Sequence, residues 1–156
     1  SRNYTRVAEA KKIMRVVADA SVVVKWYIPE KHHEEARRLR DDYLDGTHEI
    51  VASHILSFEV VNALKYSGHY EGKRLVEASE SLSEYGLELR PFGDCGPVAE
   101  VAEELDVSVY DASYVALASA VNSVVLTADE ALIEDTSGTE YTDHVEHIRD
   151  YPEIFG

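Results

Sequence analysis

The chain has 156 residues and a mass of 17.5 kDa, which fits one domain with a sizeable core. Its 45% hydrophobic content argues against disorder, and no apolar run approaches the roughly 20 residues that span a bilayer, so we expect no membrane partner. The single cysteine, Cys95, cannot form an internal disulfide, and we therefore expect a cytoplasmic protein.

Charge is distributed unevenly along the chain, whose formal net charge is −15. The stretch from Pro91 to Ile148 contains thirteen carboxylates and no Lys or Arg. A net charge of this size keeps a protein soluble and repels polyanions, so bulk charge alone counts against nucleic-acid binding. A well-solvated acidic surface is the simplest explanation for it.

The first thirteen residues differ from the rest, because they carry four basic residues and one acidic residue. The only methionine, Met14, stands directly before the first strand-like run. We therefore expect residues 1–13 to be an N-terminal appendage or an expression remnant, and residues 14–156 to form the domain.

From Met14 onward, short β-branched runs alternate with amphipathic or apolar helical stretches. The predicted strands are 15–19, 49–52, 87–92, 123–127 and 145–148. The predicted helices are 22–27, 32–44, 55–66, 73–85, 98–105, 111–121 and 130–134. Strands separated by helices imply crossover connections, so we expect an α/β fold in which helices cover both faces of a mostly parallel sheet.

Two predicted strands are each followed by an acid. Asp19 follows Val16-Val17-Ala18, and Asp129 follows the strand that ends near Thr127. Either residue alone is explained equally well as the N-cap of the next helix. Ligands of open parallel sheets, however, bind at the carboxyl ends of the strands, and two acids at that edge favour a site.

Two further acids lie on apolar helices. Glu59 interrupts the apolar helix 55–66, where it faces either a thin solvent stripe shared with Asn62 or a buried site. Asp111 stands at the start of an almost wholly apolar helix, in what we interpret as an N-cap position. That helix N-terminus is expected to point to a site inside the fold rather than to bulk water.

Four carboxylates drawn together repel one another unless they are protonated or bridged by cations. Mg²⁺ or Mn²⁺ is the usual solution, since hard divalent cations prefer oxygen ligands and magnesium needs few protein carboxylates. Such an ion activates water and neutralises charge that develops on a phosphodiester. The alternative is that all four acids are helix caps and solvated side chains.

These residues resemble the PIN-domain nucleases, and among them the VapC-type toxins of toxin–antitoxin pairs. The resemblance covers Met14 to about Ile148, and it rests on four runs in order: DASVVVKW (19–26), EVVNAL (59–64), VYDASYVALA (109–118) and LTAD (126–129). It implies a PIN-like three-layer fold in which a mostly parallel sheet is flanked by helices.

The resemblance also implies functional roles. Asp19, Glu59, Asp111 and Asp129 would be the catalytic acids, with Asp19, Asp111 and Asp129 as metal ligands. Ser21 and Thr127 would add accessory oxygens, and Asn62 would support the site. The cofactor would be Mg²⁺ or Mn²⁺, and the partners an RNA substrate, a small VapB-type antitoxin and a second copy in a homodimer.

RNA binding needs Lys or Arg near the phosphates, and residues 91–148 supply none. We therefore expect the strand to be held from the first half of the chain, first by Lys25 and then by Arg37 or Arg38. A solvated helix face paired with nearby acids is the alternative for the two arginines. His32 and His147 are expected at the surface.

The sequence thus predicts a metal-dependent endoribonuclease that is the toxin of a type II toxin–antitoxin system. One alternative is a PIN-domain nuclease of RNA processing or decay that has no antitoxin. A second alternative is a non-catalytic protein-binding module, in which the acids serve as caps and aid solubility.

Overall fold

A computed structural model describes residues 14–155, and the expectation for residues 1–13 lies outside them. The strands are β1 (Met14–Ala18), β2 (His48–Ser53), β3 (Glu88–Arg90), β4 (Val125–Thr127) and β5 (Val145–His147). The α-helices are α2 (Ala20–Val23), α3 (His33–Leu44), α4 (Leu56–Tyr66), α5 (Lys73–Glu84), α6 (Gly96–Leu105), α7 (Val109–Ala120), α8 (Glu130–Thr136) and α9 (Tyr151–Phe155). Short 3₁₀ turns are η1 (Val24–Trp26), η2 (Thr142–His144) and η3 (Ile148–Asp150).

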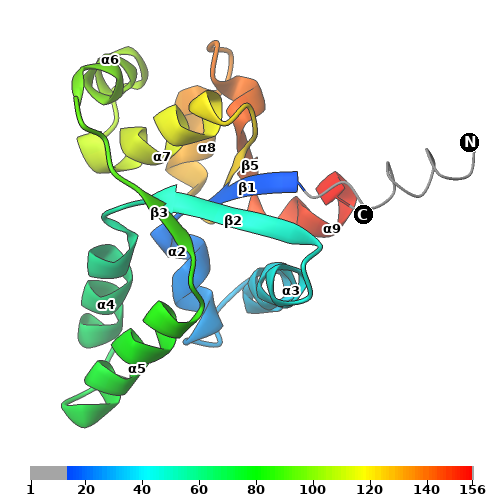
Figure 1. The fold of residues 1–156 in the computed structure, drawn as a ribbon. Helices are drawn as coiled ribbons and strands as arrows, with labels where there is room; N and C mark the ends of the chain where they lie inside the picture. Colours follow the sequence, from blue (N-terminus) through cyan, green and yellow to red (C-terminus); the bar gives the residue numbers. More distant parts are fainter. Residues whose placement is uncertain (1–13, 156) are drawn as a thin grey trace, which may run out of the picture.

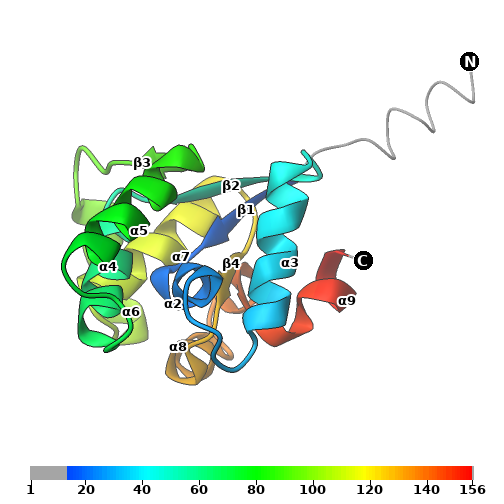
Figure 2. The same cartoon turned by 90° about the horizontal axis from the view of Figure 1, so that it is seen from below.

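The five described strands form one parallel sheet in the order β3-β2-β1-β4-β5, which confirms the predicted α/β fold. In Figure 1, α6 and α7 lie on one side of the sheet and α3 on the other. Figure 2 shows α4 and α5 side by side, away from α3. Within the described part of the chain, no helix is long and apolar enough to cross a membrane.

The core lies between the sheet and the helices that cover its faces. Strand β1 buries Val16, Val17 and Ala18 completely because it is the central strand. Helix α7 buries seven consecutive residues, from Ala112 to Ala118, so it is apolar all round, as expected for a helix enclosed by the fold.

The strand register brings the carboxyl ends of the central strands together. Ala18 of β1 pairs with Leu126 of β4, so the residues that follow these two strands are neighbours. The Asp19 amide donates to the Leu126 carbonyl at 3.3 Å. Crossover helices begin directly after both strands, and this edge therefore gathers the first turns of several helices.

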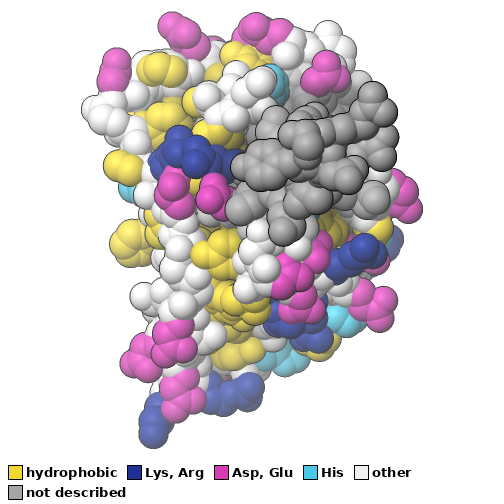
Figure 3. Space-filling model, turned by 45° about the vertical axis from the view of Figure 1, so that its right-hand side comes forward, with side chains coloured by type: hydrophobic (Ala, Val, Ile, Leu, Met, Phe, Trp, Pro, Cys, Tyr) yellow, Lys and Arg dark blue, Asp and Glu magenta, His cyan; other side chains and the backbone are white. Residues whose placement is uncertain are grey.

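The acidic composition is visible on the surface. On the face drawn in Figure 3, Asp and Glu side chains are spread widely, whereas Lys and Arg form a few small groups. Several Lys and Arg side chains of the described residues are paired with acids, including Arg15 with Glu49 and Lys73 with Glu77. Such exposed pairs contribute little to stability.

Candidate active site at the carboxyl edge of the sheet

Asp19 is held by hydroxyl and amide groups from two neighbouring strands and the helix between them. It is the N-cap of α2, and its Oδ1 accepts from Val22 N at 3.3 Å and from Ser21 Oγ at 2.6 Å. Ser21 Oγ in turn accepts from Ala128 N at 2.8 Å. The N-cap role predicted as an alternative is therefore real, but only 6% of Asp19 is exposed, which is unusual for a cap that serves no other purpose.

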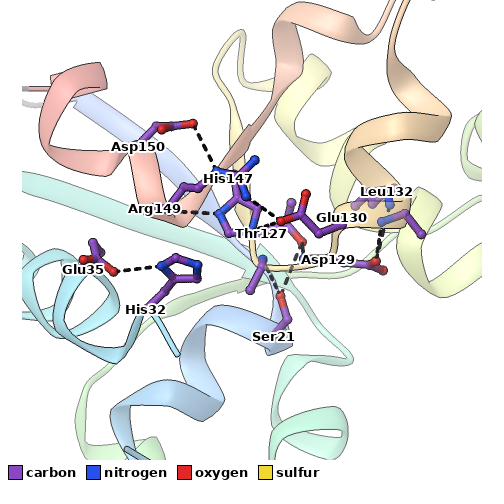
Figure 4. A network of polar contacts seen from close by, with 12 residues as sticks. Ser21, His32, Glu35, Thr127, Asp129, Glu130, Leu132, His147, Arg149 and Asp150 are labelled. Atoms are coloured by element: carbon purple, nitrogen blue, oxygen red, sulfur yellow. Dashed lines mark hydrogen bonds and ion pairs between the residues drawn. The ribbon is translucent and has the colours of Figure 1, made fainter. Parts of the chain in front are cut away.

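Asp129 occupies the corresponding place after β4. Its carboxylate caps α8 by accepting from Ala131 N at 3.0 Å, and its own amide donates to Thr127 Oγ1 at 3.1 Å. Thr127 is completely buried, and its hydroxyl lies 3.4 Å from Ser21 Oγ. Figure 4 shows Ser21 and Thr127 facing one another between the two strand ends. The two predicted accessory hydroxyls thus connect the two acids.

The prediction that Asp111 is an N-cap is wrong. Helix α7 begins two residues earlier, and its N-cap is Ser108, whose Oγ accepts from Asp111 N at 3.0 Å. Asp111 therefore lies in the first helical turn, and its carboxylate is not used as the cap. Side chains in the first turn that do not cap the helix are free to face a site, and acids are favoured there by the helix dipole.

Glu59 is half-buried in α4, and its carboxylate is bound by a side chain from another helix. Tyr114 Oη donates to Glu59 Oε1 at 2.6 Å, which links α4 to α7 across 55 positions of sequence. Tyr114 is buried and was not predicted as a site residue. One signal was present in the sequence, since Tyr114 follows Asp111 by three positions and shares its helix face.

Burial and repulsion between carboxylates raise the pKa values of Asp19, Glu59 and Asp111. Burial raises the pKa of Asp19 to about 6, and the Asp111 charge adds to the increase. Burial also raises the pKa of Asp111, with a further increase from the Asp129 charge. The pKa of Glu59 is raised by burial and by Asp111, and the Tyr114 hydrogen bond opposes the increase. The Asp111 charge therefore acts on both Asp19 and Glu59, and the Asp129 charge acts on Asp111.

The oxygen atoms at this edge suit a hard divalent cation for which the protein supplies only some of the ligands. Carboxylates and hydroxyls are the oxygen ligands that Mg²⁺ and Mn²⁺ prefer. Among residues 14–155, no three His, Cys, Asp or Glu side chains converge closely enough to enclose an ion. Magnesium commonly binds through one or two carboxylates, waters and substrate phosphates, so this looser arrangement suits it.

A cavity of about 560 Å³, here named the α2–α4 cavity, lies beside these acids. Its walls include Ser21 and Lys25 from the first helical segment, Glu59 from α4 and Ala128 after β4. Lys25 is buried, and its Nζ donates to Glu30 Oε1 at 3.1 Å. The predicted RNA contact is therefore next to the acids, but it is paired with a carboxylate.

Three other predicted residues lie outside the α2–α4 cavity. Asn62 is exposed and lines a groove with Phe58 and Leu75, between α4 and α5. Arg37 and Arg38 lie on α3, and the Arg38 charge acts on the Tyr151 hydroxyl at α9. Glu59 is bound by Tyr114 of α7 and not by Asn62 of its own helix.

The expectation that His147 is a surface residue is wrong. It ends β5, 4% of it is exposed, and its ring packs edge-on against His32 with 5.1 Å between the centroids. Its Nε2 lies 3.4 Å from Glu130 Oε1, which also binds Arg149. Figure 4 shows Glu130 turned toward these two residues. Glu130 therefore belongs to a structural ion-pair network, not to the group of four acids.

The sequence of this chain is similar to known proteins. The model of the PIN domain matches residues 16–137. Ribonuclease VapC3 from Pyrobaculum aerophilum is 32% identical over 127 residues, which cover 78% of this chain and 94% of that protein.

The fold is also found among solved structures. The crystal structure of PAE2754 from Pyrobaculum aerophilum matches with a TM-score of 0.62 and 20% sequence identity. The match covers 91% of this chain and 89% of that one. At this level of identity the likeness concerns the fold alone, and it extends over nearly the whole chain.

Proposed function

Since this chain belongs to the PIN-domain family, and within it to the VapC-type ribonucleases, we propose that it is a metal-dependent endoribonuclease. It would hydrolyse RNA phosphodiester bonds and act as the toxin of a type II toxin–antitoxin pair. The observation that carries the proposal is the placement of acids at the carboxyl edge of the sheet. Asp19 and Asp129 follow the neighbouring strands β1 and β4, and the Asp111 charge raises the pKa of both Asp19 and Glu59.

Asp19, Asp111 and Asp129 are the residues that we assign to the cation. When bound, Mg²⁺ or Mn²⁺ would neutralise charge on the phosphodiester and lower the pKa of a water molecule. Ser21 fixes the Asp19 carboxylate through a 2.6 Å hydrogen bond, and Thr127 receives the amide of Asp129. These hydroxyls keep the two strand-end acids in place without adding charge.

Glu59 and Tyr114 have a separate role in this proposal. The Tyr114 hydroxyl holds Glu59 Oε1, and the second carboxylate oxygen is left to accept a proton or a hydrogen bond from water. A carboxylate whose pKa is raised toward the working pH is suited to proton transfer. Glu59 would therefore accept a proton from the attacking water.

A partner protein is part of the proposal. The relative named above is a VapC ribonuclease, and a small VapB-type antitoxin is the partner that this naming implies. Helix α4 exposes Phe58 and Tyr66, and α5 exposes Val76, which are apolar side chains of the kind that protein partners cover. We propose that an antitoxin or the second copy of a homodimer covers this surface.

The proposal is tested by incubating a mixed RNA pool with the purified protein in Mg²⁺, in Mn²⁺ and in EDTA. We expect internal cleavage with either ion and none in EDTA. Absence of cleavage across structured and single-stranded RNAs would contradict the assignment and favour the protein-binding module. Expression alone separates the two nuclease roles, because a toxin arrests growth and a processing enzyme does not.

A further inference from the structure

Lys25 is an unusual residue in the wall of the α2–α4 cavity. Only 8% of its side chain is exposed, and its ammonium donates to Glu30 Oε1 at 3.1 Å. Among the described residues that line the cavity, Lys25 is the one cation. A nearly buried ammonium needs an anionic partner, and here Glu30 supplies it.

Glu30 can leave this ion pair easily. Its side chain is 46% exposed, so its carboxylate can return to water at little cost. The Lys25 ammonium lacks that alternative, because the Lys25 side chain is buried where η1 forms part of the cavity wall. A second anion that enters the cavity can therefore replace Glu30 on the ammonium while Glu30 turns outward.

The remaining walls suit the rest of a nucleotide. Val24, Ile28 and Ala63 present apolar surface. The hydroxyls of Ser21 and Ser67 also lie in the wall, and they donate to Asp19 and to the Leu64 carbonyl. The cavity volume of about 560 Å³ lies within the roughly 300–1,000 Å³ of small-molecule sites. Glu59 lines the same cavity, so a nucleotide there is adjacent to this acid.

We propose that the α2–α4 cavity binds one nucleotide of the substrate RNA, and that a phosphate oxygen takes the place of the Glu30 carboxylate on Lys25 Nζ. This inference rests on the proposed nuclease function. Lysine binds phosphate as a compact point charge, and carboxylate and phosphate oxygens compete for the same donors. Glu30 thus acts as an internal competitor of the RNA.

The charge distribution of the chain makes this position important. Residues 91–148 contribute Asp111 and Asp129 to the site but contain no Lys or Arg. A polyanion that approaches these acids needs a cation from elsewhere, and nucleic-acid affinity depends strongly on such contacts. Lys25 supplies one from the wall of the α2–α4 cavity.

The experiment measures KM and kcat for a short single-stranded RNA with Mn²⁺, and binding of the same fluorescent RNA in EDTA at low salt. The variants are Lys25→Met, Lys25→Arg and Glu30→Gln, and the matched control is Lys31→Met, an exposed lysine of the same segment. A charge-assisted hydrogen bond corresponds to a change of about tenfold or more. We expect Lys25→Met to raise KM and Kd by about tenfold, with partial rescue in Lys25→Arg.

Glu30→Gln is the decisive variant, because the direction of its change in RNA affinity separates the two explanations. It removes the competing carboxylate and retains the shape of the side chain. We expect it to lower KM and Kd several-fold, and we expect RNA to raise its Tm more than that of the wild type. A pair with only a structural role would lower the Tm of Glu30→Gln and leave RNA affinity unchanged.

The outcomes separate the two proposals. Wild-type cleavage together with unchanged KM and Kd in the Lys25 and Glu30 variants overturns the cavity assignment alone. A wild-type protein that neither cleaves nor binds RNA overturns the nuclease function and this inference together. If Lys25→Met does not fold, the direction of the Glu30→Gln change decides the question.

Discussion

At the residue scale, the site depends on hydroxyl groups that hold carboxylates which burial would otherwise disfavour. Ser21 donates to Asp19 at 2.6 Å, and Tyr114 donates to Glu59 at the same distance. Both bonds lower the pKa of their acids, against a larger increase from desolvation. A neutral hydroxyl thus sets the position of Asp19 and of Glu59. Because these donors carry no positive charge, the negative charge of the two acids remains available for a cation.

Replacing Tyr114 by phenylalanine removes one such donor and little volume. We expect the free energy of unfolding to fall by about 1–2 kcal/mol, because a half-buried carboxylate loses its partner. The pKa of Glu59 should rise further, so the acidic limb of the kcat/KM profile should move to higher pH. Urea unfolding and a pH–rate series measure the two effects.

Tyr110→Phe is the matched control, because Tyr110 is exposed on the same helix. It should leave both the stability and the pH profile close to those of the wild type. A Tyr114→Phe variant with an unshifted acidic limb would show that Glu59 does not transfer a proton in the reaction.

The pKa of Asp19 predicts how stability depends on pH when no metal is present. The folded protein holds this proton more tightly than the unfolded chain, since the pKa is raised from 3.8 to about 6. The resulting stabilisation is complete below the unfolded pKa and is lost as pH rises through about 6. The loss amounts to on the order of 3 kcal/mol, from about 1.4 kcal/mol per pKa unit.

Asp19→Asn removes this titration. In EDTA, the stability of the wild type should therefore fall relative to that of Asp19→Asn between pH 4 and 7.5, and Mg²⁺ should reduce the fall. Urea unfolding at a series of pH values measures the difference. Parallel stability curves for the two proteins would contradict a buried, desolvated Asp19.

At the element scale, helix α7 connects the core to the site. Its N-cap Ser108 fixes where the helix begins, and thereby where Asp111 and Tyr114 lie on its face. The sequence predicted the helix but started it at Asp111, because an acid before an apolar run is typical of an N-cap. The correct signal was Ser108 followed three residues later by an acid, a pattern close to the capping box.

Ser108→Ala should lower the free energy of unfolding by about 1 kcal/mol, the usual cost of losing an N-cap. It should also reduce RNA cleavage, since the first turn of α7 carries Asp111. Ser119→Ala, at an exposed position near the other end of α7, is the control and should change neither property. Equal effects of the two variants on cleavage would mean that the cap does not position Asp111.

At the scale of the whole molecule, the sheet explains why acids far apart in sequence meet. The alternation of strands and helices predicted a parallel sheet, and the acids after two strands predicted its active edge. The order β3-β2-β1-β4-β5 was not predicted, because strand neighbours depend on packing between distant segments. Within this order, the pairing of β1 with β4 places Asp19 beside the end of β4.

The contacts that the sequence did not predict join distant segments or depend on how the chain turns. Tyr114 meets Glu59 through a side-chain hydrogen bond between α7 and α4, which no local pattern encodes. Lys25 was predicted near the acids, but its pairing with Glu30 depends on how the chain turns after η1. His147 was expected at the surface because His144 and His147 point to opposite sides of a strand and form no pair, whereas its strand lies beside β4 and buries it.

The central claim is that the acids at the carboxyl edge are the catalytic centre of a metal-dependent ribonuclease. The most direct measurement is the single-turnover rate of RNA cleavage in Mn²⁺ by Asp19→Asn, Asp111→Asn and the exposed control Asp143→Asn, each checked for its Tm. We predict at least a ~100-fold loss in the first two variants and a wild-type rate in the third. Folded Asp19→Asn and Asp111→Asn proteins that cleave RNA as fast as the wild type would contradict the account.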